Sequence, residues 1–266
     1  MKWSRIAALL CVAATCLIVV SPAWAVKYVA LGDSYSSGTG TRAYYHANCQ
    51  RSIYAYPDLL KSAHPDWIFV NATCSGAKTG DILSTQVNSV TSDTNWVTYT
   101  IGGNDAGFSS VITECALPSW ASNCNGAVDT AQSYIANTLP GRLDLVNNAI
   151  KAKAPSAKVI ALDYPRLFNG TDCNALTFFS AGEMTRLNQT ADQLKSQVSA
   201  AATRAGANFL FRDVIPSFVG HAVCDGGGGS STEWINGLSN PVGESYHPKK
   251  TGHSSGYYPV VKAVTG

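Results

Sequence analysis

The segment Gly32-Asp33-Ser34 holds the residue of this chain that is best suited to covalent chemistry. It follows residues 27–31, a short apolar run that predicts a buried strand. A serine in a tight turn after a strand is a candidate nucleophile, but its hydroxyl is inert alone. It needs a base to take its proton and hydrogen-bond donors to stabilise an oxyanion. The simpler alternative is that Ser34 only caps a helix after the strand.

The rest of the chain offers a base and two further donors. His247 is the candidate base, because it is followed by proline in a loop near the C-terminus that leads into a predicted helix. Asn104 could donate its side-chain amide and Gly76 its backbone N–H, with the N–H of Ser34 as the third donor. Each also has a structural explanation. Asn104 suits a turn, and Gly76 could simply give the backbone room beside Cys74.

Four neighbouring residues have expected roles around this constellation. The side chain of Asp33 should point away from Ser34, so we expect a structural carboxylate that ties down the loop. Asp105, next to Asn104, is expected to be structural as well. Tyr35 is a candidate for lining an acyl pocket. His253 is expected on the closing helix, facing solvent.

Taken in order, Ser34, Gly76, Asn104 and His247 match the four sequence blocks of the SGNH (GDSL) hydrolase superfamily. The chain is similar over nearly its whole mature length to the secreted, disulfide-bonded lipases and esterases of actinobacteria. A single block such as Gly-Asp-Ser is weak evidence, whereas four blocks in order are strong. The resemblance implies a flavodoxin-like, three-layer α/β/α sandwich and hydrolysis of carboxylic esters through an acyl-serine intermediate.

The chain departs from this family at the acid of the triad. The family pattern Asp-x-x-His-Pro has aspartate where this chain has Glu244. The resemblance leaves two possibilities for the group that orients His247. One is the Glu244 carboxylate, which would make Ser34, His247 and Glu244 the catalytic residues. The other, which we favour slightly, is a backbone carbonyl of Glu244 or Ser245, as in some secreted relatives, with Glu244 then a solvated loop residue.

The resemblance does not fix the ester that is hydrolysed. We expect a lipid-like or short-to-medium acyl ester, acted on by a monomer outside the cell. The same superfamily also supplies carbohydrate acetylesterases and phospholipases A1, which are the alternative activities. A rival of another class is a secreted binding protein that has the fold but has lost the chemistry. The intact set of Ser34, Gly76, Asn104 and His247 argues against that rival.

The first 25 residues have the features of a secretory signal peptide. Lys2 and Arg5 give a basic start, residues 6–20 are almost wholly apolar, and an Ala-Trp-Ala cleavage site ends at Ala25. The apolar run is short for a membrane-spanning helix, which needs about 20 residues. No later segment is long and apolar enough, so we expect no stable membrane anchor. Residues 26–266 then suit a single hydrolase domain.

The mature chain is expected to be nearly neutral. Loss of Lys2 and Arg5 reduces the 19 Lys and Arg to 17, which equals the 17 Asp and Glu. Nothing in this balance favours a nucleic acid or an anionic surface as partner. No Cys or His spacing resembles a zinc site, so we expect neither a metal nor another cofactor.

Six of the 8 cysteines remain after cleavage, and an even number in an exported chain predicts disulfides. The sequence alone does not choose among the possible connectivities. The relatives in the resembled family pair their cysteines in chain order. Here that order implies the pairs Cys49–Cys74, Cys115–Cys124 and Cys173–Cys224.

Strand and helix patterns alternate along the chain. Strands are expected at residues 27–31, 67–71, 96–101, 158–162 and 208–211. Helices are expected at residues 53–63, at 128–154 with an interruption near Pro140, at 180–205 with a capping box of Ser180 and Glu183, and at 249–264. Alternating strands and helices predict a parallel sheet covered on both faces, in agreement with the α/β/α sandwich.

Overall fold

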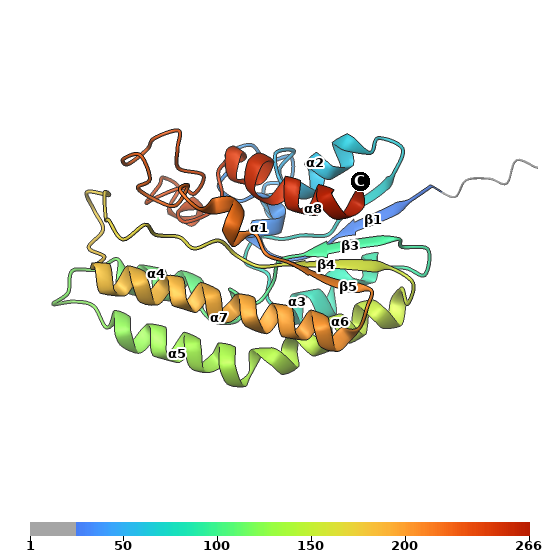
Figure 1. Cartoon of the computed structure of the whole chain (residues 1–266), viewed down its shortest axis with the longest axis horizontal. Helices are drawn as coiled ribbons and strands as arrows, with labels where there is room; N and C mark the ends of the chain where they lie inside the picture. The colour runs from blue at the N-terminus through green and yellow to red at the C-terminus, as the bar shows by residue number, and fades with distance from the viewer. Residues whose placement is uncertain (1–24) are drawn as a thin grey trace, which may run out of the picture.

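Five parallel strands form the central sheet of the computed structural model, which describes residues 25–266 (Figure 1). Apart from Ala25, the expected signal peptide lies outside the described residues. The strand order is β2-β1-β3-β4-β5. The strands are β1 (Lys27–Ala30), β2 (Ile68–Asn71), β3 (Trp96–Tyr99), β4 (Lys158–Leu162) and β5 (Phe209–Arg212). All five expected strands are confirmed, with ends that differ by one or two residues at most.

The strand order creates a crevice at the carboxyl ends of the strands, between β1 and β3. The chain passes from β1 outward to β2, and then returns to β3 on the other side of β1. In such sheets the loops that leave the two central strands diverge at their carboxyl ends, and ligands bind in the opening between them. Ser34 follows β1 and Asn104 follows β3, so the order alone brings both to this opening.

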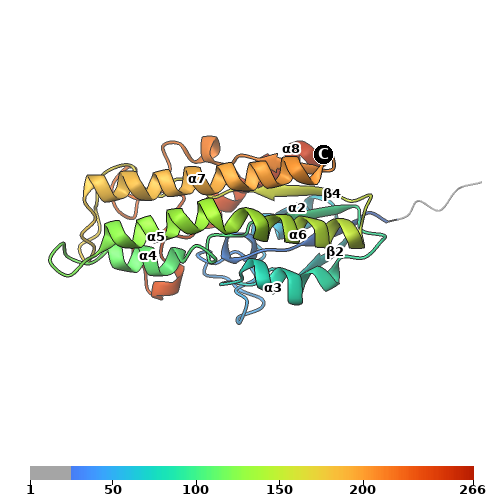
Figure 2. The same cartoon turned by 90° about the horizontal axis from the view of Figure 1, so that it is seen from below.

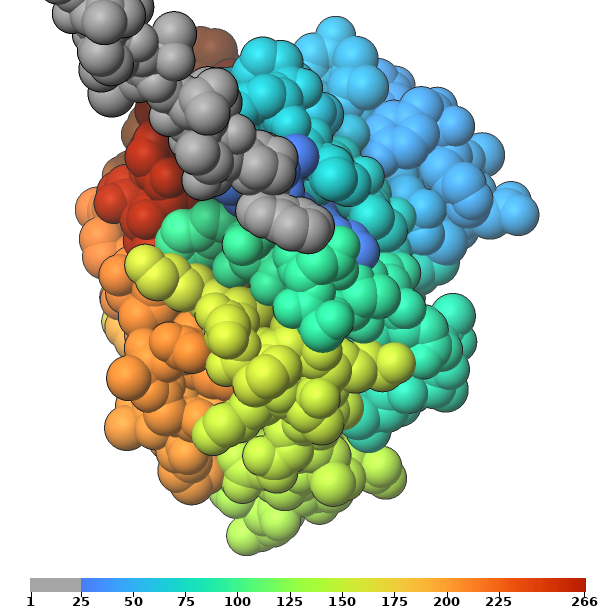
Figure 3. All heavy atoms as spheres, turned by 90° about the vertical axis from the view of Figure 1, so that its right-hand side faces the viewer, coloured from blue at the N-terminus to red at the C-terminus, as the bar shows by residue number. Residues whose placement is uncertain are grey.

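Helices cover both faces of the sheet, so the three-layer sandwich is confirmed (Figures 1 and 2). Figure 3 looks at the end where the strands begin, with α6 and α7 on one side and α2 on the other. None of the helices within residues 25–266 is long and apolar enough to cross a membrane. One face carries α1 (Ser34–Ser37), α2 (Tyr56–Ala63) and α8 (Tyr258–Thr265), and the other carries α3 (Thr79–Ser84), α4 (Phe108–Cys115), α5 (Cys124–Asn137), α6 (Leu139–Lys153) and α7 (Ala181–Ala205).

The helix limits follow the predicted signals. The pattern over residues 128–154 is divided between α5 and α6, which meet at Thr138. Pro140 lies in the first turn of α6, where its missing N–H breaks no helical hydrogen bond. The capping box of α7 is confirmed, because Ser180 Oγ accepts from Glu183 N at 3.2 Å and Glu183 Oε2 accepts from Ser180 N at 2.8 Å. Helices α3 and α4 were not expected.

The closing helix differs from the expectation at its start. It begins as a π-helix, Gly252–Tyr257, and continues as α8. His253 lies in the π-helix and is wholly buried, so the expectation that it faces solvent is wrong. The i→i+5 bonding of a π-helix changes the face on which a side chain emerges. His253 Nδ1 accepts from Tyr56 N at 3.3 Å, and burial lowers the pKa of its ring to about 3.

Three disulfides pair the cysteines in chain order, as the resemblance implied. Cys49–Cys74 joins the loop after α1 to the loop after β2, and Cys115–Cys124 closes the connection between α4 and α5. Cys173–Cys224 joins two long loops, and its cysteines are 51 residues apart. Each bridge therefore holds a loop that lies beyond the carboxyl edge of the sheet or at the end of a helix.

The disulfides should differ in their effect on stability. Replacing both Cys173 and Cys224 by serine should lower the free energy of unfolding by about 4 kcal/mol, because the chain-entropy effect grows with loop length. The same change at Cys115 and Cys124, which are 9 residues apart, should cost about 2.6 kcal/mol. Guanidinium unfolding followed by fluorescence measures both values. A larger loss for the shorter loop would contradict this ordering.

Candidate active site

A strained turn after β1 presents Ser34 as the first residue of α1. Gly32 has φ +117°, and a Cβ there would lie 2.4 Å from the carbonyl oxygen of Thr100, so only glycine fits. The side-chain amide of Gln86 binds both the backbone N–H and the backbone carbonyl of Gly32. Gly32 N donates to Gln86 Oε1 at 2.7 Å, and Gln86 Nε2 donates to the Gly32 carbonyl at 3.0 Å. Gln86 is not among the site residues predicted from the sequence.

Asp33 is a structural carboxylate, as expected. Its Oδ1 accepts from Tyr35 N at 3.0 Å, which caps α1, and from Thr100 Oγ1 at 2.7 Å. Its Oδ2 accepts from the hydroxyl of Tyr164, which follows β4. Burial raises the pKa of Asp33 to about 6, against the lowering effect of these hydrogen bonds. Asp33 therefore ties the turn before Ser34 to two other strands.

Tyr164 also reaches the loop that carries Asn104. Its hydroxyl accepts a hydrogen bond from Gly103 N at 3.3 Å while it donates to Asp33. One side chain thus sets the spacing between the turn before Ser34 and the residue before Asn104. Tyr164 is not among the site residues predicted from the sequence. A signal for Tyr164 does exist in the sequence. The residue lies just after an expected strand, and in a parallel sheet the carboxyl end of that strand is on the same side of the sheet as Ser34.

The structure brings Ser34 and His247 into direct contact, although 213 residues separate them. The distance between Ser34 Oγ and His247 Nε2 is 2.8 Å, and both side chains are buried. On the other side of the ring, Nδ1 lies 2.9 Å from the carbonyl oxygen of Ser245. Because a carbonyl can only accept, Nδ1 carries the proton and Nε2 is free to accept from the Ser34 hydroxyl. Burial lowers the pKa of His247 to about 4, partly opposed by the Ser245 hydrogen bond, so the ring is neutral at pH 7.

The turn Ser245-Tyr246-His247 is held by hydrogen bonds on both sides. Tyr246 has φ +60°, in the left-handed region, and this conformation directs the Ser245 carbonyl back to the ring. Asn236 pairs with the turn through two backbone hydrogen bonds, Asn236 N to His247 O and Tyr246 N to Asn236 O, each 2.9 Å long. The Tyr35 hydroxyl donates to the Tyr246 carbonyl at 2.5 Å. The residue after Ser34 therefore also positions His247.

The Glu244 carboxylate has partners other than His247, which agrees with the backbone-carbonyl alternative and not with a catalytic role for this carboxylate. Its Oε1 accepts from the hydroxyl of Tyr44 at 2.6 Å, and its Oε2 accepts from Arg42 Nε at 3.0 Å. The side chain is only 3% exposed, so the expectation of a solvated loop residue is wrong. Glu244 joins the histidine loop to the loop after α1. The physical reason is that the Ser245 carbonyl already occupies Nδ1.

Gly76 and Asn104 lie together beside the turn of Ser34. Asn104 Nδ2 donates one hydrogen bond to the carbonyl of Ala77 at 3.0 Å, which leaves its second N–H for another acceptor. Cys74 N donates to the Gly32 carbonyl at 3.0 Å, so the Gly76 loop is fixed to the turn that carries Ser34. The N–H of Ser34 belongs to the first turn of α1 and has no acceptor within the helix.

The need for glycine at position 76 is conformational rather than spatial. Gly76 has φ +82°, and a Cβ there would meet no described atom within 4 Å. The explanation of backbone room beside Cys74 is therefore wrong. Asp105 is structural, as expected, because its carboxylate accepts from Thr79 N at 3.0 Å and from Thr79 Oγ1 at 2.5 Å.

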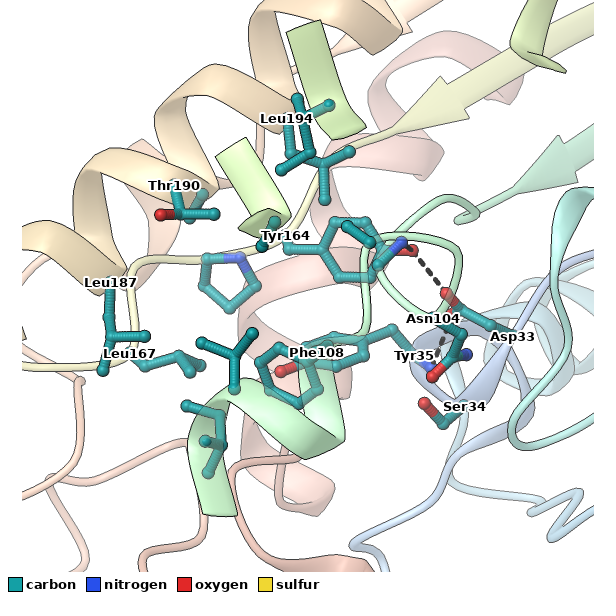
Figure 4. A pocket seen from close by; sticks show the side chains of 18 residues that line it. Asp33, Ser34, Tyr35, Asn104, Phe108, Tyr164, Leu167, Leu187, Thr190 and Leu194 are labelled. Carbon is teal, nitrogen blue, oxygen red and sulfur yellow. Dashed lines mark hydrogen bonds between the residues drawn. The ribbon is translucent and has the colours of Figure 1, made fainter. Parts of the chain in front are cut away.

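An apolar pocket extends from Ser34 and Asn104 into the layer of helices α4, α5 and α7 (Figure 4). In Figure 4 Ser34 and Asn104 lie at one end, and Leu167 and Leu187 lie at the other. Tyr35 lines the pocket, as expected. Most of the other lining side chains are aliphatic or aromatic. They include Phe108, Val111, Ile112, Ile135, Tyr164 and Leu194.

Residues 30–254 match the GDSL-like lipase/acylhydrolase family. The chain belongs to this family. It is 43% identical to Lipase 1 of Streptomyces coelicolor over 91% of this chain and 88% of that protein. It is 41% identical to a lipase of Streptomyces rimosus over 91% of this chain and 87% of that protein.

Two solved structures share the fold of this hydrolase closely. The extracellular lipase from Streptomyces rimosus has a TM-score of 0.82 at 40% identity, and phospholipase A1 from Streptomyces albidoflavus has a TM-score of 0.81 at 41% identity. Each match covers 90% of this chain and 99% of the other. The predicted family, fold and activity as a carboxylic ester hydrolase are confirmed.

Replacing Glu244 by glutamine should affect stability more than catalysis in this hydrolase. We expect kcat/KM to fall less than tenfold, about 1.4 kcal/mol, because the Ser245 carbonyl would still orient His247. The free energy of unfolding should fall by about 1 kcal/mol, because the charge-assisted bond to the half-exposed Arg42 is weakened. Ester hydrolysis and denaturant unfolding measure the two effects.

Arg42→Met is the matched control, because it removes the same ion pair without touching the histidine loop. It should lower the free energy of unfolding at least as much as Glu244→Gln, because it leaves the buried Glu244 carboxylate without its cation, and it should leave kcat/KM close to that of the wild type. A thousandfold loss of kcat/KM in Glu244→Gln, with the fold intact, would restore the carboxylate as the partner of His247.

The low pKa of His247 should appear in the acid limb of the pH profile. A base must be neutral to accept a proton, so kcat/KM should stay level from pH 7 to about 5 and fall through the pKa of about 4. The profile is measured by product chromatography on an uncharged ester, with circular dichroism to exclude unfolding. A limb centred near pH 6.5, the value of an unperturbed histidine, would contradict the burial argument.

Proposed function

We propose that this protein hydrolyses lipid-like carboxylic esters through an acyl intermediate on Ser34, with His247 as the general base. The observation that carries the proposal is the 2.8 Å contact between Ser34 Oγ and His247 Nε2 at the head of an apolar pocket. A buried serine and neutral histidine in this geometry form a nucleophile and its base.

The reaction proceeds in two steps. Ser34 Oγ attacks the ester carbonyl carbon as its proton passes to His247 Nε2, and the carbonyl oxygen becomes the oxyanion. The C–O bond to the alcohol then breaks, and the leaving oxygen takes the proton from Nε2. In the second step water attacks the acyl-serine, again losing its proton to Nε2, and the carboxylic acid leaves as Ser34 regains the proton. The Ser245 carbonyl accepts from Nδ1–H throughout and stabilises the imidazolium.

Three N–H donors stabilise the oxyanion in this proposal. They are the backbone N–H groups of Ser34 and Gly76 and the free N–H of the Asn104 side chain. The bond from Asn104 to Ala77 and the bond from Cys74 to Gly32 support this assignment, because they hold the donors in place before the substrate binds. Loss of one such donor typically costs about 3 to 4 kcal/mol of transition-state stabilisation.

The apolar pocket favours an acyl chain longer than acetyl. An acetyl group would leave most of the pocket unfilled, whereas each further buried CH₂ contributes about 0.8 kcal/mol. This preference argues against a carbohydrate acetylesterase. Phospholipase A1 activity is the second candidate, and it is supported by the same pocket and by the 41% identity to the Streptomyces albidoflavus enzyme of that name.

We further propose that the enzyme is secreted after cleavage of residues 1–25. The three disulfides support this, because such bridges persist in oxidising compartments. The similar lipase from Streptomyces rimosus is described as extracellular. The basic, then apolar, start of the chain provides the export signal.

Ser34→Ala should abolish both hydrolysis and labelling by a fluorophosphonate ester, because the attacking oxygen is gone. The wild type should hydrolyse p-nitrophenyl octanoate with a higher kcat/KM than p-nitrophenyl acetate, and should show little release of acetate from acetylated xylan. Phosphatidylcholine serves as the phospholipase substrate.

Ser37→Ala is the matched control, since Ser37 is a buried serine on the same short helix and should retain activity and labelling. Substantial hydrolysis by a folded Ser34→Ala protein would refute the assigned nucleophile. Faster hydrolysis of acetyl esters than of octanoyl esters would refute the acyl class while leaving the nucleophile in place.

A further inference from the structure

We propose that two loops at one end of the molecule dock the enzyme on a zwitterionic lipid surface. The proposal rests on the proposed function, because it concerns how an aggregated lipid substrate is reached. The surface, called the apolar tip below, consists of Leu117 and Trp120 in the loop between α4 and α5, and of Leu176 and Phe178 in the loop before α7.

All four side chains of the apolar tip are exposed. Trp120 is 87% exposed, Leu176 76%, Phe178 54% and Leu117 39%. The two loops lie against each other, because Phe178 N donates to the carbonyl of Ala116 at 3.2 Å. Figures 1 and 2 both show them at the same end of the molecule, where α4 ends and α7 begins. Clustered exposed apolar side chains on a folded protein mark an interaction site.

The loops are held in shape, so the tip does not need to be ordered on binding. Cys115–Cys124 closes the first loop at its base, and Cys173–Cys224 anchors the second. Within the second loop, the Asp172 carboxylate accepts from Thr177 Oγ1 at 2.8 Å and from the backbone N–H of Phe179 at 3.0 Å. A rigid surface loses little conformational entropy on association.

The charge of the loops selects the kind of surface. Residues 116–123 and 174–180 contain no charged side chain. The charges at their bases, Glu114 and Asp172, are both negative, and each carboxylate accepts a backbone hydrogen bond from its own loop, Glu114 from Asn123 N and Asp172 from Phe179 N. Binding to anionic lipid depends on Lys and Arg, which both loops lack. Tryptophan and phenylalanine instead suit the boundary between lipid head groups and acyl chains.

The same two helices, α4 and α7, connect the apolar tip with the acyl pocket. Ile112, in the last turn of α4, and Leu187, in the second turn of α7, both line the pocket. Leu117 and Phe178 follow and precede the same two helices. Figure 4 shows Leu187 at the end of the pocket that is remote from Ser34. The pocket thus runs from the nucleophile toward the end of the molecule that carries the tip.

The test measures binding of the protein to vesicles without hydrolysis. Ser34→Ala protein is mixed with phosphatidylcholine vesicles, and the bound fraction is measured by sedimentation. Adding Trp120→Ser and Leu176→Ser should lower the partition coefficient at least tenfold, equivalent to about 1.4 kcal/mol. Val219→Ser, at a residue that is 73% exposed outside the tip, should lower it less than twofold. Raising the NaCl concentration to 0.5 M should also have less than a twofold effect.

A second readout keeps folding and function separate from docking. With Ser34 intact, the Trp120→Ser, Leu176→Ser protein should keep the wild-type kcat/KM on dissolved p-nitrophenyl butyrate, which shows that it is folded. Three results would each overturn the docking proposal. The first is a partition coefficient that the two changes leave unaltered. The others are binding that requires phosphatidylglycerol and disappears in salt, and a self-association of the protein that the two changes abolish. Failure of the wild type on the dissolved ester would overturn the proposed function instead, whatever the vesicles show.

Discussion

The active site depends on a neutral, buried imidazole held between two oxygen atoms. His247 Nε2 is 2.8 Å from Ser34 Oγ, and Nδ1 is 2.9 Å from the Ser245 carbonyl. A carbonyl fixes the ring tautomer without placing a second charge in the interior, where an ion pair carries a large desolvation cost. It offers the imidazolium less stabilisation than a carboxylate would. The histidine loop must therefore be held rigidly by other means, and Tyr35 and Asn236 supply them.

The buried carboxylate next to Ser34 holds backbone and hydroxyl groups in place and is not a partner of the imidazole. Asp33 receives hydrogen bonds from Tyr35 N, Thr100 and Tyr164, which come from three different parts of the sheet edge. Tyr164 in turn accepts from the N–H before Asn104. The turn that carries Ser34 and the loop that carries Asn104 are thus parts of one network. Glu244 is linked to Arg42 and Tyr44, so this carboxylate also joins two loops and is paired away from the imidazole.

Much of this protein could be predicted because its signals are local. Apolar runs fixed all five strands, and the pair Ser180 and Glu183 fixed the start of α7, since both depend on neighbouring residues. The positions of Ser34 and Asn104 after two strands followed from the apolar runs that precede them, whereas only the strand order of the folded sheet makes those two strands neighbours. Helices α3 and α4 were missed because they are short and lie within loops that follow strands. The register of the π-helix, which buries His253, was missed as well.

The sequence by itself determined the fold class and the family, and it supplied the candidates for nucleophile, base and oxyanion donors, because each is encoded by residue types at fixed spacing. Only the tertiary structure decided which oxygen meets His247 Nδ1, since Glu244 and Ser245 are adjacent in the chain and a left-handed Tyr246 selects between them. It also decided the apolar pocket beside Ser34, whose walls come largely from α4, α5 and α7. The physical reason is the same in both cases. Contacts between residues far apart in the chain depend on how the elements pack, and no local pattern records that packing.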